Sequence, residues 1–145
     1  MLEKVPEGDY VLPELTFDIT LLPISREREV GIYPNATSQL VKEFRSAGLS
    51  AQFLDPPERR NWQKLLGDVP LDLLVAIAAG VASNAVWAGM VKVLASMYGA
   101  DRKAHVRLVR QRKKPDGTVS NDWFSYDGDI KGLGDCWEKT SKDDG

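Results

Sequence analysis

Few residues in this 145-residue chain are of the types that carry out catalysis. His105 is the only histidine and Cys136 the only cysteine. General acid or base catalysis would need His105 in a pocket with an orienting carboxylate, but the residues beside it in sequence are cationic. A cysteine nucleophile needs cationic surroundings, whereas Asp135 and Glu138 lie beside Cys136. We therefore expect a surface histidine, a structural cysteine, no catalytic residue and no cofactor.

An acidic loop at residues 127–138 partly fits a calcium loop of the EF-hand type. Counted from its first residue, the positions that supply oxygen ligands or the sharp turn hold Asp127, Asp129, Gly132, Asp135 and Glu138. Lys131 places a cation where the motif needs an oxygen ligand, and no clear helix flanks the loop. Calcium binding stays an alternative for this loop. Turn formation within a solvated acidic tail explains the same residues, so we predict no metal site.

A basic segment at residues 101–114 contains seven Lys or Arg residues and one Asp. Cations on such a segment can follow phosphates, and the aromatic residues of 118–127 could stack on single-stranded bases. Aromatic residues on a return strand usually face the core, however, and a basic strand in a nearly neutral protein often pairs with its own acids. Nucleic-acid binding through this basic hairpin therefore stays a further alternative, and we assign Arg107, Arg110 and Arg112 to a protein-binding surface.

The most apolar stretch of the chain runs from Leu71 to Gly99. Its length predicts one long helix at residues 71–98, since buried strands usually run four to eight residues. Small residues would form one stripe on that helix: Ala78, Ala82, Ala85 and Gly89. Such a stripe lets another backbone approach closely. It is either a seam in the core or the docking seam for a protein partner or a second copy of the chain.

A membrane anchor is the alternative for the same stretch. Residues 73–91 are uncharged and just long enough for a hydrocarbon layer of about 30 Å. Many alanine and glycine residues, with Asn84 near the middle, weaken that hypothesis. The N-terminal residues contain no secretory signal, and a lone cysteine fits a reducing compartment. We expect a cytoplasmic protein, with membrane association through residues 73–91 as the alternative.

The remaining pattern predicts a small α+β domain. Composition is that of an ordinary globular protein, with 43% hydrophobic and 28% charged residues and a net charge of −2. Residues 1–13 are expected to form an extended arm, residues 14–127 the domain, and residues 128–145 a partly ordered acidic tail. Alternating polarity predicts strands at 14–22, 29–33, 49–53, 104–112 and 118–127. Periodicity of the helical kind predicts helices at 37–47 and 71–98 and one or two helical turns at 58–67.

These elements assemble most economically as a mixed or antiparallel sheet of about four or five strands. Two main helices would pack on one face, in the order β-α-β-α-β-β. The alternating strands would leave the other face of the sheet wet.

The order of these elements resembles the effector-associated constant component domains of bacterial conflict systems. The matching residues are Gly67, Leu71, Leu74, Trp87, Arg102, Lys103, Val106, Leu108, Asp116 and Gly117. The resemblance covers about residues 14–127 and implies a non-catalytic adaptor that couples a sensor to an effector through protein contacts. This chain departs from the family pattern in its N-terminal arm and C-terminal extension. The sequence thus predicts a non-enzymatic interaction or adaptor module, in the setting of bacterial defence or toxin immunity.

Overall fold

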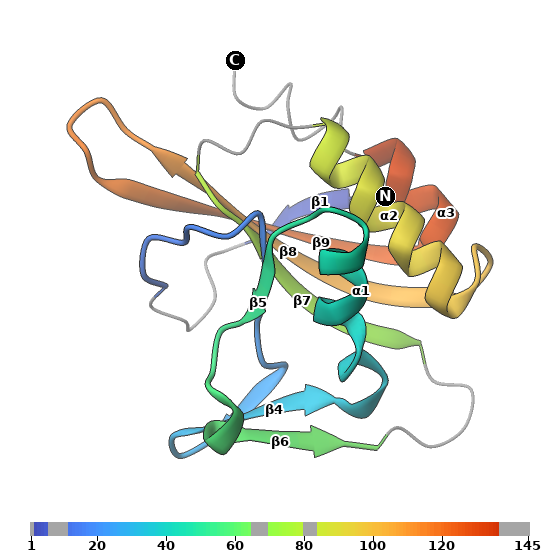
Figure 1. Ribbon diagram of the computed structural model, residues 1–145. Coiled ribbons are helices and arrows are strands. Elements are labelled where there is room, and N and C mark those ends of the chain that lie inside the picture. Colours follow the sequence, from blue (N-terminus) through green and yellow to red (C-terminus); the bar gives the residue numbers. More distant parts are fainter. Residues whose placement is uncertain (1, 6–11, 65–69, 80–83, 137–145) are drawn as a thin grey trace.

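The computed structural model describes residues 2–5, 12–64, 70–79 and 84–136 of the chain. Within these residues the protein is α+β, with a six-stranded mixed sheet, a three-stranded sheet and three α-helices (Figure 1). The α+β class and the mixed sheet that the sequence predicts are confirmed.

The large sheet contains β1 (Leu2–Val5), β2 (Ile19–Leu21), β5 (Ala51–Phe53), β7 (Leu71–Ile77), β8 (Lys103–Lys113) and β9 (Val119–Asp129). The small sheet contains β3 (Ser25–Glu27), β4 (Val30–Pro34) and β6 (Arg60–Gln63). The α-helices are α1 (Leu40–Ser46), α2 (Asn84–Tyr98) and α3 (Ile130–Leu133), and short 3-10 turns are η1 (Asn35–Thr37), η2 (Pro57–Arg59) and η3 (Gly134–Cys136).

The strands of the large sheet lie in the order β1-β9-β8-β7-β2-β5. β7 and β8 are parallel neighbours joined through α2, and β8 and β9 form the antiparallel hairpin that the alternating pattern predicts. β2 is antiparallel to β7 and parallel to β5, which leaves β5 at one edge of the sheet. The predicted order β-α-β-α-β-β is not confirmed, because short strands before α1 and between β5 and β7 add to it.

The prediction of one long helix at residues 71–98 is wrong. Its first part, Leu71–Ile77, is β7, and the helix α2 begins only at Asn84. β7 lies between two neighbours and is buried on both faces, so its sequence is continuously apolar and gives no alternation. Such a run cannot be told from a buried helix by periodicity alone. In the part of the chain that is described, no helix is long and apolar enough to cross a membrane.

All three α-helices cover the same face of the large sheet (Figure 1). The buried side chains of this layer come from α1 (Leu40, Val41, Phe44), α2 (Trp87, Met90, Leu94) and α3 (Ile130, Leu133), packed on strand residues that include Leu73, Val75, Val106 and Leu108. Trp87 Nε1 donates a hydrogen bond to the carbonyl of Leu133 over 3.2 Å, which joins α2 to α3. Burying each large side chain contributes roughly 1.5–3 kcal/mol, so this layer supplies most of the core.

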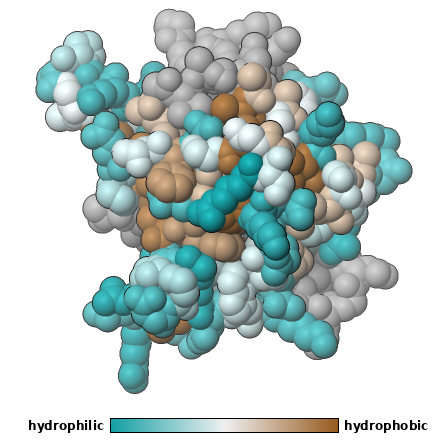
Figure 2. All heavy atoms as spheres, in the orientation of Figure 1, coloured by the Kyte–Doolittle hydropathy of each residue, from teal (hydrophilic) through white to brown (hydrophobic). Residues whose placement is uncertain are grey.

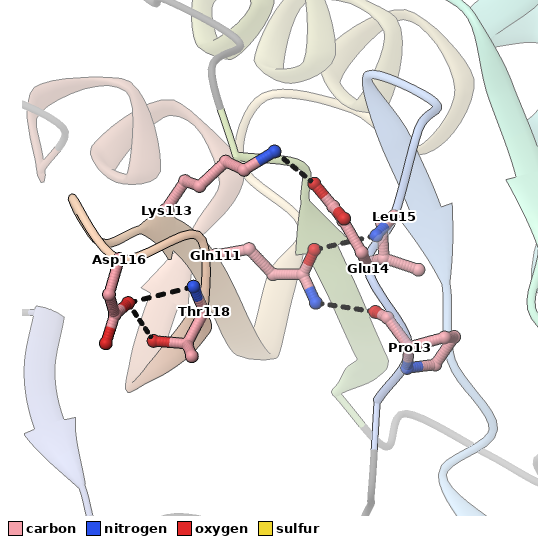
Figure 3. Close-up of polar contacts among 7 residues, drawn as sticks. All are labelled: Pro13, Glu14, Leu15, Gln111, Lys113, Asp116 and Thr118. Carbon is pink, nitrogen blue, oxygen red and sulfur yellow. Dashed lines mark hydrogen bonds and ion pairs between the residues drawn. The ribbon is translucent and has the colours of Figure 1, made fainter.

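The opposite face of the sheet is partly covered by the segment before β2. Gln111 of β8 holds that segment with both ends of its amide (Figure 3). Its Oε1 accepts from the backbone N–H of Leu15, its Nε2 donates to the carbonyl of Pro13, and both distances are 2.8 Å. Lys113 adds an ion pair with Glu14 at 3.3 Å. Gln111 is only 2% exposed. Its buried amide gives the backbone of this segment the hydrogen bonds that a neighbouring strand would otherwise supply.

The predicted strand at residues 14–22 is therefore shorter than its pattern suggests. Only Ile19–Leu21 pair with other strands. Leu15 packs with Leu22 and Leu74 in a second cluster, whereas Ile19 faces the helices. The alternating segment first lies against the face of the sheet away from the helices, where Leu15 is buried. It then joins the sheet as β2, in which Ile19 faces the helices.

The predicted arm and tail are more regular than expected. Leu2–Val5 pair with β9 as an antiparallel edge strand, from Leu2 opposite Tyr126 to Val5 opposite Trp123. At the other end, Asp129 caps α3 by accepting from the backbone N–H of Gly132 at 2.9 Å. Residues 130–136 of the predicted, partly ordered tail form α3 and η3, and residues 137–145 lie outside the described part.

The helical turns predicted at residues 58–67 are wrong for residues 60–63, which form a strand, and residues 65–67 lie outside the described part. η2 occupies only Pro57–Arg59, and the chain then extends as β6, parallel to β4. The apolar spacing of Trp62 with Leu65 suggested a helix, but Trp62 instead lies on the face of β6 that meets Tyr33 of β4. The predicted strand at 29–33 and the helix at 37–47 correspond to β4 and to η1 with α1.

Proline substitutions separate the observed strand and helix from one continuous helix. Ala76→Pro should lower the free energy of unfolding by at least about 3 kcal/mol, because a central strand needs its N–H groups on both sides. Ala85→Pro lies in the first turn of α2, where N–H groups have no intrahelical acceptor, and should cost about 1 kcal/mol. Urea denaturation monitored by circular dichroism measures both. An equally large loss at Ala85 would place that residue in a helix interior and contradict the structure.

Candidate docking site beside strand β5

The outer edge of β5 carries backbone groups that no strand satisfies. Ile19 N–H donates to the carbonyl of Ser50 at 3.1 Å, and Leu54 N–H donates to the carbonyl of Leu21 at 2.9 Å. Backbone groups alternate in direction along a parallel strand, so those of Ala51 and Phe53 point away from β2. The carbonyl of Ala51 accepts from Arg45 Nε at 2.9 Å. The N–H groups of Ala51 and Phe53 and the Phe53 carbonyl bond to no residue that the structure describes.

A groove of about 640 Å³ runs along this edge, between α1 on one side and η2 with β6 on the other. Figure 2, drawn in the orientation of Figure 1, shows apolar surface near the middle of this face, with hydrophilic side chains around it. The residues that line the groove and enter the argument below are Lys42, Arg45, Phe53, Asp55 and Arg60.

Three aromatic rings pack together where Phe53 lines the groove. Phe53 of β5 meets Tyr33 edge to face at 5.2 Å between ring centroids and meets Trp62 edge to face at 5.5 Å. Tyr33 and Trp62 lie 5.8 Å apart at a tilt. Such pairs add about 0.5–1.5 kcal/mol each beyond the area that they bury. They fix Trp62 in place although 40% of it is exposed.

Asp55 joins the small sheet to the large one beneath these rings. Its carboxylate accepts from Tyr33 Oη at 2.8 Å and pairs with Arg26 Nη2 of β3 at 2.9 Å, while only 7% of the residue is exposed. The backbone N–H of Asp55 donates back to Tyr33 Oη at 3.2 Å. Gly31 faces this carboxylate, and a Cβ there would collide with Asp55 Oδ2. Glycine at residue 31 is therefore required for the close approach.

The groove has a positive rim. Lys42 and Arg45 of α1 are exposed, and Arg60 of β6 is half-buried with its guanidinium 4.3 Å from the centre of the Phe53 ring. Arg60 Nε also donates to the carbonyl of Asp55 at 2.6 Å. Within the described residues none of these three cations forms an ion pair. The one carboxylate that lines the groove, Asp55, is engaged by Arg26 and Tyr33.

The small residues predicted to form one stripe do not share a surface. Ala78 is buried after the end of β7, at 2% exposure, whereas Ala85 is exposed in the first turn of α2. Gly89 is half-buried against the methyl groups of Leu49 and lines a second groove of about 550 Å³ between α1 and α2. Ala82 lies outside the described residues. A stripe that depends on one continuous helix is lost when its first part is a strand.

The predicted arginines point to opposite faces of β8. Arg107 lies on the face away from the helices, 3.7 Å from Asp72. Arg112 Nε lies 2.6 Å from Asp122 Oδ2, and Arg110 Nη2 lies 3.6 Å from the same oxygen. Arg110 is only 7% exposed. The three arginines assigned to a binding surface therefore lie beside acidic residues of their own sheet.

The aromatic residues of the return strand do not form a stacking surface. Trp123, Phe124 and Tyr126 are at most 5% exposed. Phe124 and Tyr126 face the helices, and Trp123 belongs to the cluster on the other face.

His105 has an orienting carboxylate that the sequence analysis missed. Its Nδ1 lies 2.6 Å from Asp127 Oδ1, because the antiparallel register places the two residues opposite each other on β8 and β9. The signal was the hairpin itself, since a turn at residues 115–117 sets this pairing. The Asp127 side chain is 77% exposed, so the pair lies open to solvent on the sheet surface rather than in a pocket.

The acidic loop is divided between different tasks. Asp127 contacts His105, whereas Asp129 caps α3. No group of three or more His, Cys, Asp or Glu side chains that could hold a metal ion is found among the residues described. Glu138 lies outside them, and so calcium binding by the whole loop stays untested.

No family model matches the sequence, and neither the curated proteins nor the solved structures include a match.

The groove was not foreseen from the sequence, although parts of its signal are present. Pro56 and Pro57 end β5, and Trp62 stands out as an aromatic residue among polar neighbours. The contact of Tyr33 with Asp55 joins β4 to the loop after β5 across 22 residues of sequence, which no local pattern specifies.

The phenol of Tyr33 should ionise at a higher pH than that of Tyr98. Burial raises its pKa well above the ordinary value of 10.0, and the hydrogen bond to Asp55 raises it further. Burial also raises the pKa of Tyr98, to about 12. The stability that comes from keeping Tyr33 neutral is complete below about pH 10 and falls as the pH rises above it.

Alkaline titration followed by tyrosinate absorbance tests this expectation. Tyr33→Phe should remove a step that lies above the Tyr98 step and leave the Tyr98 step unchanged. If the step lost in Tyr33→Phe lies near the ordinary tyrosine pKa, Tyr33 is not buried against Asp55.

Proposed function

We propose that this protein is a non-enzymatic interaction module, an adaptor, that docks a protein partner on Trp62 and the adjoining groove. One observation carries the proposal. Trp62 is the one large hydrophobic side chain that is exposed in the described part of the chain, and it lies beside a groove with an unpaired strand edge. Tryptophan and arginine are the residue types most enriched at the energetic centres of protein interfaces.

The surface is held in place before any partner arrives. Trp62 packs on Phe53 and Tyr33, and Arg60 is fixed by its hydrogen bond to the carbonyl of Asp55. A side chain that is already ordered loses little conformational entropy on binding, so more of its contact energy contributes to affinity. This arrangement favours docking of a partner on a rigid surface.

The biological setting of the proposal rests on the family resemblance alone. In the effector-associated constant component domains, a domain of this layout is thought to couple a sensor to an effector through protein contacts. Transferred to this chain, that implies an adaptor in a bacterial defence or toxin-immunity system. The groove would then be the site that receives one of those components.

The alternative functions find less support. A single helical anchor at residues 73–91 has no basis where Leu73–Ile77 form part of a strand. Nucleic-acid binding by the hairpin would need its paired arginines and buried rings to be freed. A second copy of the chain stays a candidate partner for the docking surface.

Trp62→Ala should weaken binding of the partner by about 30-fold, as expected for loss of roughly 2 kcal/mol at an interface centre. Asn61→Ala is the matched control, because Asn61 is an exposed neighbour on the other face of the same strand. To find the partner, a photo-crosslinking amino acid is placed at residue 62, and separately at residue 61, in the cells from which the protein comes. The captured protein is then purified, and its affinity for each alanine variant is measured by calorimetry.

The proposal requires a partner that crosslinks from residue 62 but not from residue 61. It also requires that Trp62→Ala weaken that partner while circular dichroism shows the variant still folded at the assay temperature, although loss of the ring contacts with Phe53 and Tyr33 lowers its melting temperature. Equal crosslinking from both positions, or an affinity that does not change in Trp62→Ala, would reject this surface as the docking site.

A further inference from the structure

We infer that the groove beside β5 receives an extended, acidic segment of a partner protein, which adds to the large sheet as a strand next to β5. The inference rests on the proposed interaction function and adds the chemistry and the backbone conformation of the partner.

The unpaired edge of β5 determines the backbone conformation. The outward N–H groups of Ala51 and Phe53 and the Phe53 carbonyl are spaced to bond an extended chain. A peptide that adds to a sheet edge gains its affinity from such main-chain bonds, and alternate side chains give the specificity. Helical segments satisfy their own backbone groups and so could not use this edge.

The rim of the groove determines the charge of the partner. Lys42 and Arg45 stand on α1 beside the edge, and Arg60 stands over Phe53 across the groove. Asp55, the carboxylate among the lining residues, is already paired with Arg26. A partner with Asp or Glu residues would therefore meet three cations without displacing an internal ion pair, whereas a basic segment would meet like charges.

The two faces of the sheet carry different residues at the β5 edge, so we expect two kinds of side chain to alternate along the partner segment. Phe53 packs in the cluster on the helix side, together with the cations of α1. Leu54 packs in the cluster on the other side of the sheet. Successive residues of an added strand point to opposite faces, so acidic residues on the helix side would alternate with apolar residues on the other.

The test uses three synthetic peptides and the full chain. In the first peptide Glu alternates with Val, and in the second Lys replaces each Glu. The third has the sequence of the first but is N-methylated at alternate residues, which removes the N–H donors along one edge of the peptide. Two versions are made, one methylated at the odd residues and one at the even residues. Binding is measured by calorimetry, and backbone amide exchange is measured by NMR with and without peptide.

The Glu-Val peptide should bind and should slow exchange of the Ala51 and Phe53 amides, while the Gln52 amide, which faces β2, changes little. The Lys-Val peptide should bind at least about tenfold more weakly, and one N-methylated version should lose binding. Lys42→Glu should weaken the Glu-Val peptide by about fivefold. Lys92→Glu is the matched control, because Lys92 is an exposed lysine on α2, beside the second groove.

Several outcomes would overturn the inference. Equal binding of the Glu-Val and Lys-Val peptides would reject the role of charge, and binding without protection of Ala51 and Phe53 would reject strand addition. Light scattering that shows a dimer, with the same two amides protected in the absence of peptide, would make a second copy the occupant.

Failure of this inference can be told apart from failure of the proposed function. If no peptide binds but residue 62 still crosslinks its partner, the acidic strand alone is rejected. If the crosslink at residue 62 is also lost, the docking function is rejected with it.

Discussion

The need to cover β7 on both faces organises the whole molecule. Its side chains point alternately toward the helices and toward the opposite face, and nearly all of them are buried. Leaving either set in water would forfeit roughly 1.5–3 kcal/mol for each large side chain. The helix face is covered by α1, α2 and α3, and the other face is partly covered by the segment that Gln111 holds through its amide. The hydrogen bonds of Gln111 thus hold the partial cover of one face, whereas a layer of helices covers the other.

Local patterns in the sequence predict the half-buried parts of this fold better than its centre. The hairpin of β8 and β9 alternates in polarity and carries a clear turn, so its two strands were expected within a few residues. β7 was mistaken for helix because burial on both faces removes alternation, and its apolar run continued into α2. The small sheet escaped prediction because β4 and β6 pair across the intervening α1 and β5. The docking groove depends on that pairing and was therefore missed with it.

Asp55 shows how a costly interaction can serve precision rather than stability. A carboxylate at 7% exposure loses much of its hydration, and its contacts with Arg26 and Tyr33 offset that cost without a large net gain. What these contacts do supply is a fixed position for the small sheet relative to β5. The contacts of Asp55 thereby position Trp62 and Arg60 of β6 beside the groove. Gly31 permits the close approach of the Asp55 carboxylate to β4.

The strand order also constrains how the chain reaches its native state. The β8–β9 hairpin closes through a short turn, and β7 joins β8 through α2, so these three strands need only modest loop closure. β2 and β1 must instead find partners far along the chain, in β7 and β9. Pairings between distant segments slow folding because their closure entropy is lost before any contact forms. The C-terminal half is thus expected to order first, and during synthesis on the ribosome β1 must wait, unpaired, for β9, which is made after every other described strand.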